Sequence, residues 1–417
     1  MVLLVNTSER TGGAAVAANR LLKALNKNGV EARMLVLHKT SNDPCVSTIG
    51  KPWQKKWKFY RERILIWFNN LFSRKNLFTV STADSGFDIT KHPDFINADI
   101  VHLHWINQGL LSLKSIKKIL SSGKPVVWTL HDMWPFTGIC HYAGECEHYA
   151  SQCHHCPLLS HGAVKDLSFR SFNKKRKLFA NSKVTFVGCS HWMENIARKG
   201  LLTQGQRSTN IPNAIDTEVF KPMDKSAVRK KYNLPQDKKL LLFGAMNIND
   251  KRKGIDYLMA ACEHLSAACP DLGKKIGIVV FGSNTAQYTS LFPFPCFPLP
   301  YITKESELAE IYSAVDMFVT PSLQDNLPNT IMESLACGTP CVGFHIGGIP
   351  EMIDHRSNGY VAKYQSAEDL AAGICFVLSH PNYTSLCANA RKKVLEHYSE
   401  NVVAKRYGEV YRLSNGD

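Results

Sequence analysis

The sequence has no long apolar run, and no stretch approaches the roughly twenty apolar residues that a membrane-spanning helix needs. A secretion signal is not expected either, because Met1 leads directly into the strand-like MVLLVN without a basic start or a cleavage site. Thirteen cysteines, an odd number spread over 417 residues, do not suggest a disulfide framework. We therefore expect a protein of the reducing cytoplasm.

Negative charge is scarce in the first half of the chain. Residues 1–205 hold 28 basic and 13 acidic residues, a balance of +15, whereas residues 206–417 hold 22 of each. This excess suggests nucleic acid, an anionic membrane surface or an acidic substrate as a partner. Because the sequence contains no RRM, KH or zinc-finger pattern, we expect no nucleic acid partner, and a nucleic-acid-binding protein stays the alternative from another class.

Short strand-like apolar runs alternate with helical patterns along both halves, which predicts an α/β protein built from βαβ units. The runs lie at 1–6, 32–38, 99–103, 125–130 and 184–189, and then at 239–244, 276–282, 315–320 and 340–344. Helical patterns lie at 14–28, 191–200, 254–268, 367–379 and 400–413.

The two series are separated by NIPNAIDTEVFKP at 210–222, which is rich in Pro and Asn and has no clear periodicity. We expect two Rossmann-like doubly wound domains, at 1–205 and 206–400, facing each other across a cleft. A helix at 401–417 should pack back toward the first domain. Ligands of such sheets bind at the carboxyl ends of the strands, so the cleft is the expected site.

The glycine fingerprint of dinucleotide-binding proteins, GxGxxG, is missing. Instead, Gly12 and Gly13 follow the first strand and open a helix, whose N-terminus favours an anion. An ordinary strand-to-helix turn explains the pair equally well.

Three cations, Lys251, Arg252 and Lys253, precede a predicted helix start at Gly254. Cations repel the positive end of a helix dipole unless an anion lies between them. A solvated basic loop is the alternative.

Two carboxylates lie eight positions apart in DNLPNTIMESLACGTP, residues 325–340. We expect Asn326 to be the N-cap of a helix with Pro328 in its first turn and Gly338 at its end. Asp325 then lies before the helix and Glu333 inside it. Without a role in binding, they would be a dipole-favouring acid and a solvated glutamate.

Together these features fit a nucleoside diphosphate sugar. Cations and backbone N–H groups would hold the diphosphate, Glu333 two vicinal hydroxyls, and Asp325 a second polyol. Since we find no DxD pair suited to Mg²⁺, the leaving diphosphate would be neutralised without a metal.

At this point the chain resembles the retaining glycosyltransferases of the GT-B fold, in family 4, which includes bacterial exopolysaccharide, colanic-acid and lipopolysaccharide enzymes. The family's E-x7-E and A-x-A-C-G-x-P motifs resemble the run from Asp325 through SLACGTP, and its I-P-N-G-I-D-x-x-x-F resembles IPNAIDTEVF. Two positions depart from the pattern: Asp325 replaces a glutamate, and Ala245 replaces an arginine.

The resemblance implies that the first acid contacts the transferred sugar and the second the ribose. Asn326 and Leu327 would lend backbone N–H groups, and Arg252 and Lys253 would supply positive charge. His131, in TLHDMWPFTG, corresponds to a histidine that contacts the donor.

The resemblance implies transfer of a hexosyl unit from a nucleoside diphosphate sugar to a saccharide acceptor, with retention and without a catalytic cofactor. In the family's manner, we expect this acceptor to be lipid-linked. The basic first domain would bind the acceptor and the second domain the donor. The alternatives are a phosphorylase or inverting enzyme on the same fold, and an inactive family member.

A cysteine-rich insert, residues 137–157, contains Cys140, Cys146, Cys153 and Cys156, interleaved with histidines. Four thiolates closed by a C-x-x-C suit one structural Zn²⁺. Unligated thiols and disulfides are the alternatives. Because the insert follows His131, we expect it to shape the acceptor side of the cleft.

The segment 51–78 interleaves aromatic residues with eight cations and one acid. A basic, aromatic, amphipathic helix is typical of proteins that lie on anionic membranes. This pattern predicts a cytoplasmic protein that is peripheral on the inner face of the cell membrane. The alternative is a helix packed on its domain with solvated cations; for His102 and His104 of VHLHW we expect core packing.

Overall fold

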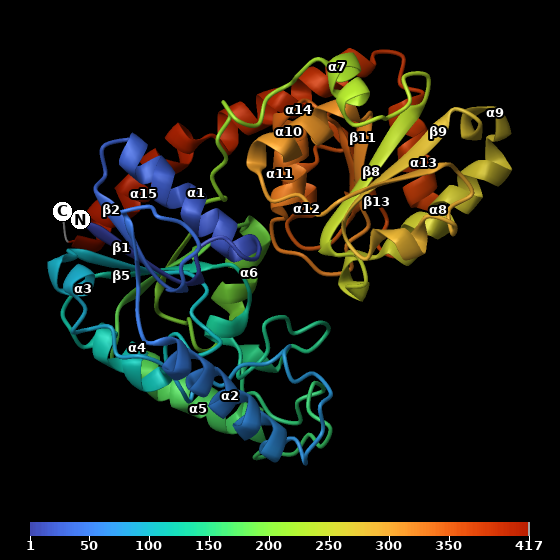
Figure 1. The fold of residues 1–417 in the computed structure, drawn as a ribbon. Helices are drawn as coiled ribbons and strands as arrows, with labels where there is room; N and C mark the ends of the chain where they lie inside the picture. Colours follow the sequence, from blue (N-terminus) through green and yellow to red (C-terminus); the bar gives the residue numbers. More distant parts are fainter. Residues whose placement is uncertain (416–417) are drawn as a thin grey trace. The chain divides into compact units, whose positions relative to one another are not determined.

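The structure is a computed structural model, which describes residues 1–415 and divides into two compact units. Unit 1 comprises residues 1–213 and the C-terminal segment from Val403 onward, and unit 2 comprises residues 214–402. Each unit contains one sheet of parallel strands with helices on both of its sides (Figure 1). The predicted α/β class with two doubly wound sheets is confirmed.

The sheet of unit 1 has seven parallel strands in the order β3-β2-β1-β4-β5-β6-β7. Its strands are β1 (Val2–Ser8), β2 (Ala32–His38), β3 (Val46–Thr48), β4 (Ile100–Leu103), β5 (Val126–Leu130), β6 (Val184–Gly188) and β7 (Arg207–Asn210). The central strands β4, β5 and β6 are buried along their whole length, as their continuous apolar sequences require.

The helices of unit 1 include several with a polar cap at the first turn. Ser112, Asp166 and Ser190 each accept a backbone N–H at the start of their helix. The helices between the strands of unit 1 are α1 (Gly13–Lys27), α2 (Pro52–Asn69), α3 (Pro93–Asn97), α4 (Leu113–Leu120), α5 (Leu167–Phe179) and α6 (His191–Lys199), and the three caps belong to α4, α5 and α6.

The sheet of unit 2 has six parallel strands in the order β10-β9-β8-β11-β12-β13. Its strands are β8 (Lys239–Asn247), β9 (Ile276–Ser283), β10 (Cys296–Leu299), β11 (Met317–Thr320), β12 (Cys341–Phe344) and β13 (Gly359–Ala362). Its helices are α7 (Lys225–Lys231), α8 (Ile255–Ala268), α9 (Pro270–Gly273), α10 (Glu305–Ala314), α11 (Asn329–Ala336), α12 (Ile349–Met352), α13 (Ala367–Leu378) and α14 (Tyr383–His397).

The last helix, α15 (Glu400–Asn415), returns the chain to unit 1. The hydroxyl of Tyr411 lies 2.8 Å from Nδ1 of His102, and the hydroxyl of Tyr407 lies 2.9 Å from that of Thr129. His102 and Thr129 belong to the buried strands β4 and β5, so α15 covers the sheet of unit 1. Residues 416 and 417 of the predicted helix lie outside the described residues.

No helix in the described part of the chain combines the length and apolar character needed to cross a membrane.

Candidate functional site

The strand order of unit 2 reverses direction between β8 and β11, and ligands of doubly wound sheets bind where this happens. Lys253 follows β8, and Asp325 follows β11. The Lys253 ammonium lies 2.7 Å from Oδ2 of Asp325, and both side chains are only partly exposed. Two predicted donor-site residues, 72 positions apart in the sequence, therefore meet at the reversal point.

Close backbone contacts hold the loops at this edge of the sheet. Gly254 has φ +70°, and a Cβ there would overlap the carbonyl oxygen of Pro321. Gly347 has φ +57°, and a Cβ there would overlap the carbonyl oxygen of Asp325. Both positions need glycine, so the loops after β8, β11 and β12 pack against one another without side chains between them.

The loop after β11 is tied further by two backbone bonds. Leu323 donates its N–H to the carbonyl of Arg252 at 2.7 Å, and Gly348 donates its N–H to the carbonyl of Asn326 at 2.8 Å. Asn326 and Leu327 are both buried.

Glu333 is buried on α11, where the hydroxyl of Tyr312 donates to its Oε2 at 3.1 Å. Burial and the Glu333 carboxylate both raise the pKa of Tyr312 well above its usual range. The alternative of a solvated glutamate is wrong, because α11 turns this side chain inward. A buried carboxylate that is held by a neutral hydroxyl keeps its capacity to accept further hydrogen bonds.

The predicted helix start needs a correction. α11 begins at Asn329 with Pro328 at the N-cap, so Asn326 is not the cap and Pro328 does not lie in the first turn. Asn326 instead lies in the loop that Gly348 holds. The predicted end is confirmed, since Gly338 follows the C-cap Cys337 with φ +72°.

Arg252 pairs with an acid of its own loop. Its guanidinium binds the carboxylate of Asp250, with Nε 3.1 Å from Oδ1 and Nη2 2.7 Å from Oδ2. This side chain is more than half exposed. Of the two predicted cations, Lys253 is the one that the structure shows in contact with Asp325.

In unit 1 the strand order reverses between β1 and β4. Gly12, at φ +96°, is the N-cap of α1, and Gly13 is its first residue, directly beyond β1. The end of β1 is joined there to the loop after β4, because Thr7 donates its N–H to the carbonyl of Trp105 at 2.8 Å and Asn6 Oδ1 accepts the N–H of Trp105 at 2.9 Å.

His131 follows β5 and is half-buried. Its Nε2 lies 2.9 Å from Nδ1 of His104, and its Nδ1 lies 3.6 Å from Sγ of Cys189. Burial lowers the pKa of His131 to about 4 and that of His104 well below the usual range. His131 is therefore a neutral hydrogen-bonding group at pH 7, and the expected core packing of His102 and His104 is confirmed by their burial.

Next to His131 lies a pair that the sequence patterns did not reveal. Asp132 is buried, and its Oδ2 lies 2.6 Å from Nδ1 of His141 and accepts the indole N–H of Trp105 at 2.7 Å. The Trp105 ring stacks on His141, whose Nε2 lies 3.0 Å from the Ser81 hydroxyl. Spacing could not have predicted this contact, because it depends on how the insert folds back onto the end of β5.

Family models match both units. The model described as "Glycosyltransferase Family 4" matches residues 11–219, just over half of the chain, and that described as "Glycosyl transferases group 1" matches residues 237–380. The chain belongs to glycosyltransferase family 4.

Individual relatives are distant from this family 4 chain. N-acetyl-alpha-D-glucosaminyl L-malate synthase of Bacillus anthracis is 22% identical over 48% of the chain and 52% of that protein. A shorter match, 32% identical over 27% of the chain and 30% of the relative, is to N,N'-diacetylbacillosaminyl-diphospho-undecaprenol alpha-1,3-N-acetylgalactosaminyltransferase of Campylobacter jejuni. The chain spans about half the length, or less, of these curated relatives.

Among solved structures, sucrose-phosphate synthase from Thermosynechococcus elongatus has a TM-score of 0.68 at 19% identity, covering 99% of this chain and 98% of that one. At this identity the likeness concerns the fold, and it confirms the GT-B architecture predicted for this family 4 chain.

The four cysteines of the insert line one small cavity of about 20 Å³, together with His148 and His154. All four are free thiols, and burial raises the pKa of Cys140 and Cys153 to about 12 and that of Cys156 to about 11. Within residues 1–415, no three His, Cys, Asp or Glu side chains are arranged to hold a metal ion. The zinc site at Cys140, Cys146, Cys153 and Cys156 and its alternative of unligated thiols stay predictions, and the structure adds that all four side chains line the same cavity.

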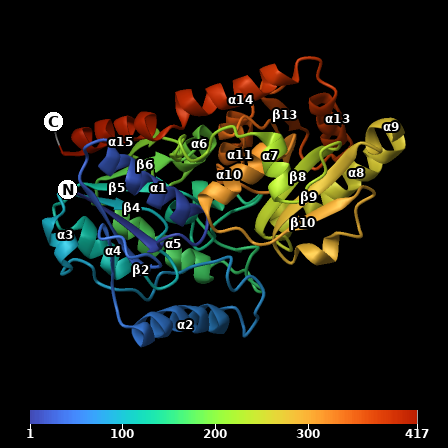
Figure 2. The same cartoon turned by 45° about the horizontal axis from the view of Figure 1, so that its top comes forward.

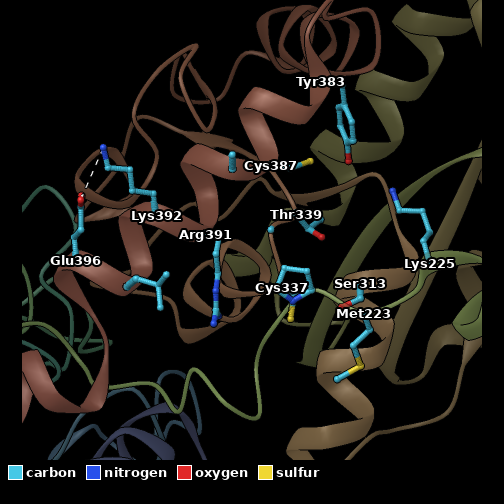
Figure 3. Close-up of a pocket in the computed structure, with 14 residues that line it drawn as sticks. Met223, Lys225, Ser313, Cys337, Thr339, Tyr383, Cys387, Arg391, Lys392 and Glu396 are labelled. Carbon is cyan, nitrogen blue, oxygen red and sulfur yellow. Dashed lines mark ion pairs between the residues drawn. The ribbon is translucent and has the colours of Figure 1, made fainter.

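A larger cavity of about 610 Å³ lies in unit 2 beyond the C-terminal end of α11, where Cys337 and Gly338 line it (Figure 3). Its cations have partners: Lys225 Nζ lies 3.0 Å from Oδ1 of Asp316, and Arg391 donates to the carbonyls of Phe220 and Ala336. In the described part of the chain, none of the predicted donor residues lines this cavity.

Proposed function

We propose that this family 4 chain transfers a hexosyl unit from a nucleoside diphosphate sugar to a saccharide acceptor with retention of configuration. The observation that carries the proposal is the contact between Lys253 and Asp325 at the strand reversal of unit 2, with Glu333 buried on the next helix. A cation, a partly exposed carboxylate and a buried carboxylate are the groups that a diphosphate and two sets of hydroxyls need.

Each side chain has a separate task in this proposal. The Lys253 ammonium neutralises the diphosphate, Asp325 accepts hydrogen bonds from the transferred sugar, and Glu333 accepts those of the ribose. The backbone N–H groups of Asn326 and Leu327 supply further donors beside the diphosphate, and Gly12 and Gly13 supply the anion-favouring start of α1. Arg252 contributes charge from the loop.

The proposed reaction breaks the bond between the anomeric carbon and the diphosphate oxygen. The acceptor hydroxyl oxygen forms the new bond on the same face, and its proton passes to the departing diphosphate. Charge on the leaving group is stabilised by Lys253 and by backbone dipoles, as expected for family members that need no metal cofactor. His131 is neutral, so it would position the sugar by hydrogen bonding.

The acceptor is proposed to be lipid-linked, in the biosynthesis of a surface polysaccharide at the cytoplasmic face of the membrane. This suggestion is supported by the basic first half of the chain and by the name of the Campylobacter jejuni relative, which contains diphospho-undecaprenol.

The test is a thermal-shift titration of the full chain with UDP, GDP and their common sugar conjugates. We expect one base to stabilise the protein, and Glu333→Gln to weaken its affinity about 10- to 100-fold, since a hydrogen bond to a charged group contributes about 1.5–3 kcal/mol. Glutamine keeps an oxygen that can accept the Tyr312 hydroxyl, so the core should persist.

Glu368→Gln on α13 is the matched control, because Glu368 is exposed in the same unit. Equal affinity of wild type and Glu333→Gln would remove the proposed ribose contact, and the absence of any nucleotide response would favour an inactive member. Once a donor is known, NMR of the product's anomeric proton distinguishes retention from inversion.

A further inference from the structure

Helix α2 (Pro52–Asn69) runs along the outside of unit 1 (Figure 2). One row of its side chains is large, apolar and exposed. Relative exposure is 65% for Trp53, 61% for Trp57, 57% for Tyr60, 47% for Ile64 and 54% for Phe68. Such a row normally packs against a core, so its exposure marks an interaction surface.

These five residues form one narrow stripe. At about 100° of rotation per residue, positions 53, 57, 60, 64 and 68 fall within an arc of about 80°. The stripe therefore runs along the helix from its first turn to its last.

The chain extends the stripe beyond the end of the helix. Leu71 and Phe72 follow α2 with φ of +49° and +61°, and both side chains are more than half exposed. Bulky residues rarely adopt this backbone conformation. The Phe72 ring lies 4.8 Å from that of Trp67 and 5.2 Å from that of Phe68, so the unusual turn adds an aromatic cluster to the end of the stripe.

Positive charge borders the stripe on both sides. Lys56 and Arg61 are exposed, and the rotation per residue places them on opposite edges of the arc. The one acid of segment 51–78, Glu62, is buried. The exposed face of α2 is therefore apolar along its middle and cationic along its edges.

The opposite face of α2 is fixed to unit 1. Glu62 Oε1 accepts the N–H groups of Thr82 and Ala83, both at 2.8 Å, and Arg63 Nη1 donates to the carbonyl of Val80 at 3.0 Å. Lys58 donates to the carbonyl of Gly86 at 2.7 Å. These bonds fix the orientation of α2 about its own axis, so the stripe stays exposed to solvent.

We propose that this face of α2 docks unit 1 on an anionic lipid surface, with the stripe from Trp53 to Phe72 at the level of the headgroups and Lys56 and Arg61 bound to lipid phosphates. Trp and Tyr favour the membrane interface because each combines an apolar ring with a polar group. A second copy of the chain would bring like charges together, and a nucleic acid would leave the apolar stripe in water. This docking rests on the proposed function only for its biological role, because binding to lipid does not require the nucleotide sugar.

The experiment measures sedimentation of the full chain with vesicles of phosphatidylglycerol and phosphatidylcholine, without nucleotide. We expect binding to rise with the phosphatidylglycerol fraction, and Trp53→Ser with Trp57→Ser to lower the partition coefficient by about tenfold or more. Ile64→Ser should weaken binding, whereas the same change at Ile96 of α3, which is 60% exposed, should not. The double variant Lys56→Glu with Arg61→Glu should bind the vesicles more weakly. The control double variant Lys114→Glu with Lys117→Glu, on the exposed side of α4, should bind as wild type does.

Bromine-labelled acyl chains give a second readout, because they quench tryptophans that enter the bilayer. Quenching that disappears in the double Trp variant supports insertion of the stripe. Equal binding by wild type, the double Trp variant and Ile64→Ser overturns the proposal, as does a self-association that Trp57→Ser abolishes. Because the thermal shift by nucleotide is independent of vesicles, loss of docking with an intact shift would leave the proposed function standing.

Discussion

At the scale of single residues, unit 1 has a row of neutral histidines, with His102 on β4 and His104 and His131 directly after β4 and β5. His102 binds Tyr411 and Thr129, and His104 binds His131. Burial lowers the pKa of His102 to about 3, and a neighbouring histidine adds to the shift. Such rings can exchange hydrogen bonds but cannot accept a proton without cost.

This burial predicts acid sensitivity. Between pH 6.5 and about 3 an unfolded histidine binds a proton that folded His102 does not, so the unfolding free energy falls as pH falls, by up to about 1.4 kcal/mol per pH unit for each such group. Urea unfolding measured from pH 7 to pH 4.5 should show that the unfolding free energy depends less steeply on pH in His102→Gln than in wild type. His264→Gln, at an exposed site on α8, should keep the wild-type slope, and parallel slopes for all three proteins would contradict the prediction.

The residues of the candidate site were predictable where a local motif defines them. Asp325 and Glu333 could be selected from their spacing, but the contact of Asp325 with Lys253 joins loops after two different strands. The pairing of Asp132 with His141 likewise depends on the path of the insert. Contacts of this kind arise from tertiary packing, and no local pattern contains them.

At the scale of elements, α2 depends on one buried carboxylate. Glu62→Ala would leave the N–H groups of Thr82 and Ala83 unpaired and would remove the acid partner of Arg63, 3.0 Å away. Breaking a buried network of this type costs about 3 kcal/mol of unfolding free energy.

Urea unfolding measures this loss, and limited proteolysis of segment 51–78 reports it locally. Glu62→Gln keeps the accepting oxygen and should lose clearly less stability. If alanine and glutamine behave alike, the two backbone bonds do not hold α2.

The strands that sequence patterns missed share one property. Each of the nine predicted runs overlaps a strand, whereas β3, β7, β10 and β13 were not predicted, and these are the outermost strands of the two sheets. Central strands are buried on both faces and read as continuous apolar runs, but edge strands of three or four residues carry polar or exposed side chains. Their pairing depends on the neighbouring strand, so their own residues contain no pattern that predicts a strand.

At the scale of the whole molecule, the two units have separate cores. Buried residues from Leu3 to Leu202 form one cluster, and those from Leu241 to Leu386 form another. Separate cores suggest that heat unfolds the chain in two transitions.

If unit 2 holds the donor, a nucleotide sugar should raise only one transition in a calorimetric scan. The expected stabilisation is about 2.7 kcal/mol at a hundred times the dissociation constant. Glu333→Gln, with its 10- to 100-fold weaker affinity, should reduce the stabilisation to about 0.4–1.4 kcal/mol and leave the other transition in place. A single transition that moves as a whole would show that the units unfold together.

The return of α15 to unit 1 affects the order in which the chain is completed during synthesis. Unit 2 is one uninterrupted segment, and all of it has been made before residue 403 is added. Unit 1 must wait for Tyr407 and Tyr411, which cover His102 and Thr129 near the middle of its sheet. The unit that starts first on the ribosome is therefore the one that finishes last, and until then His102 and Thr129 lack these two hydroxyl partners.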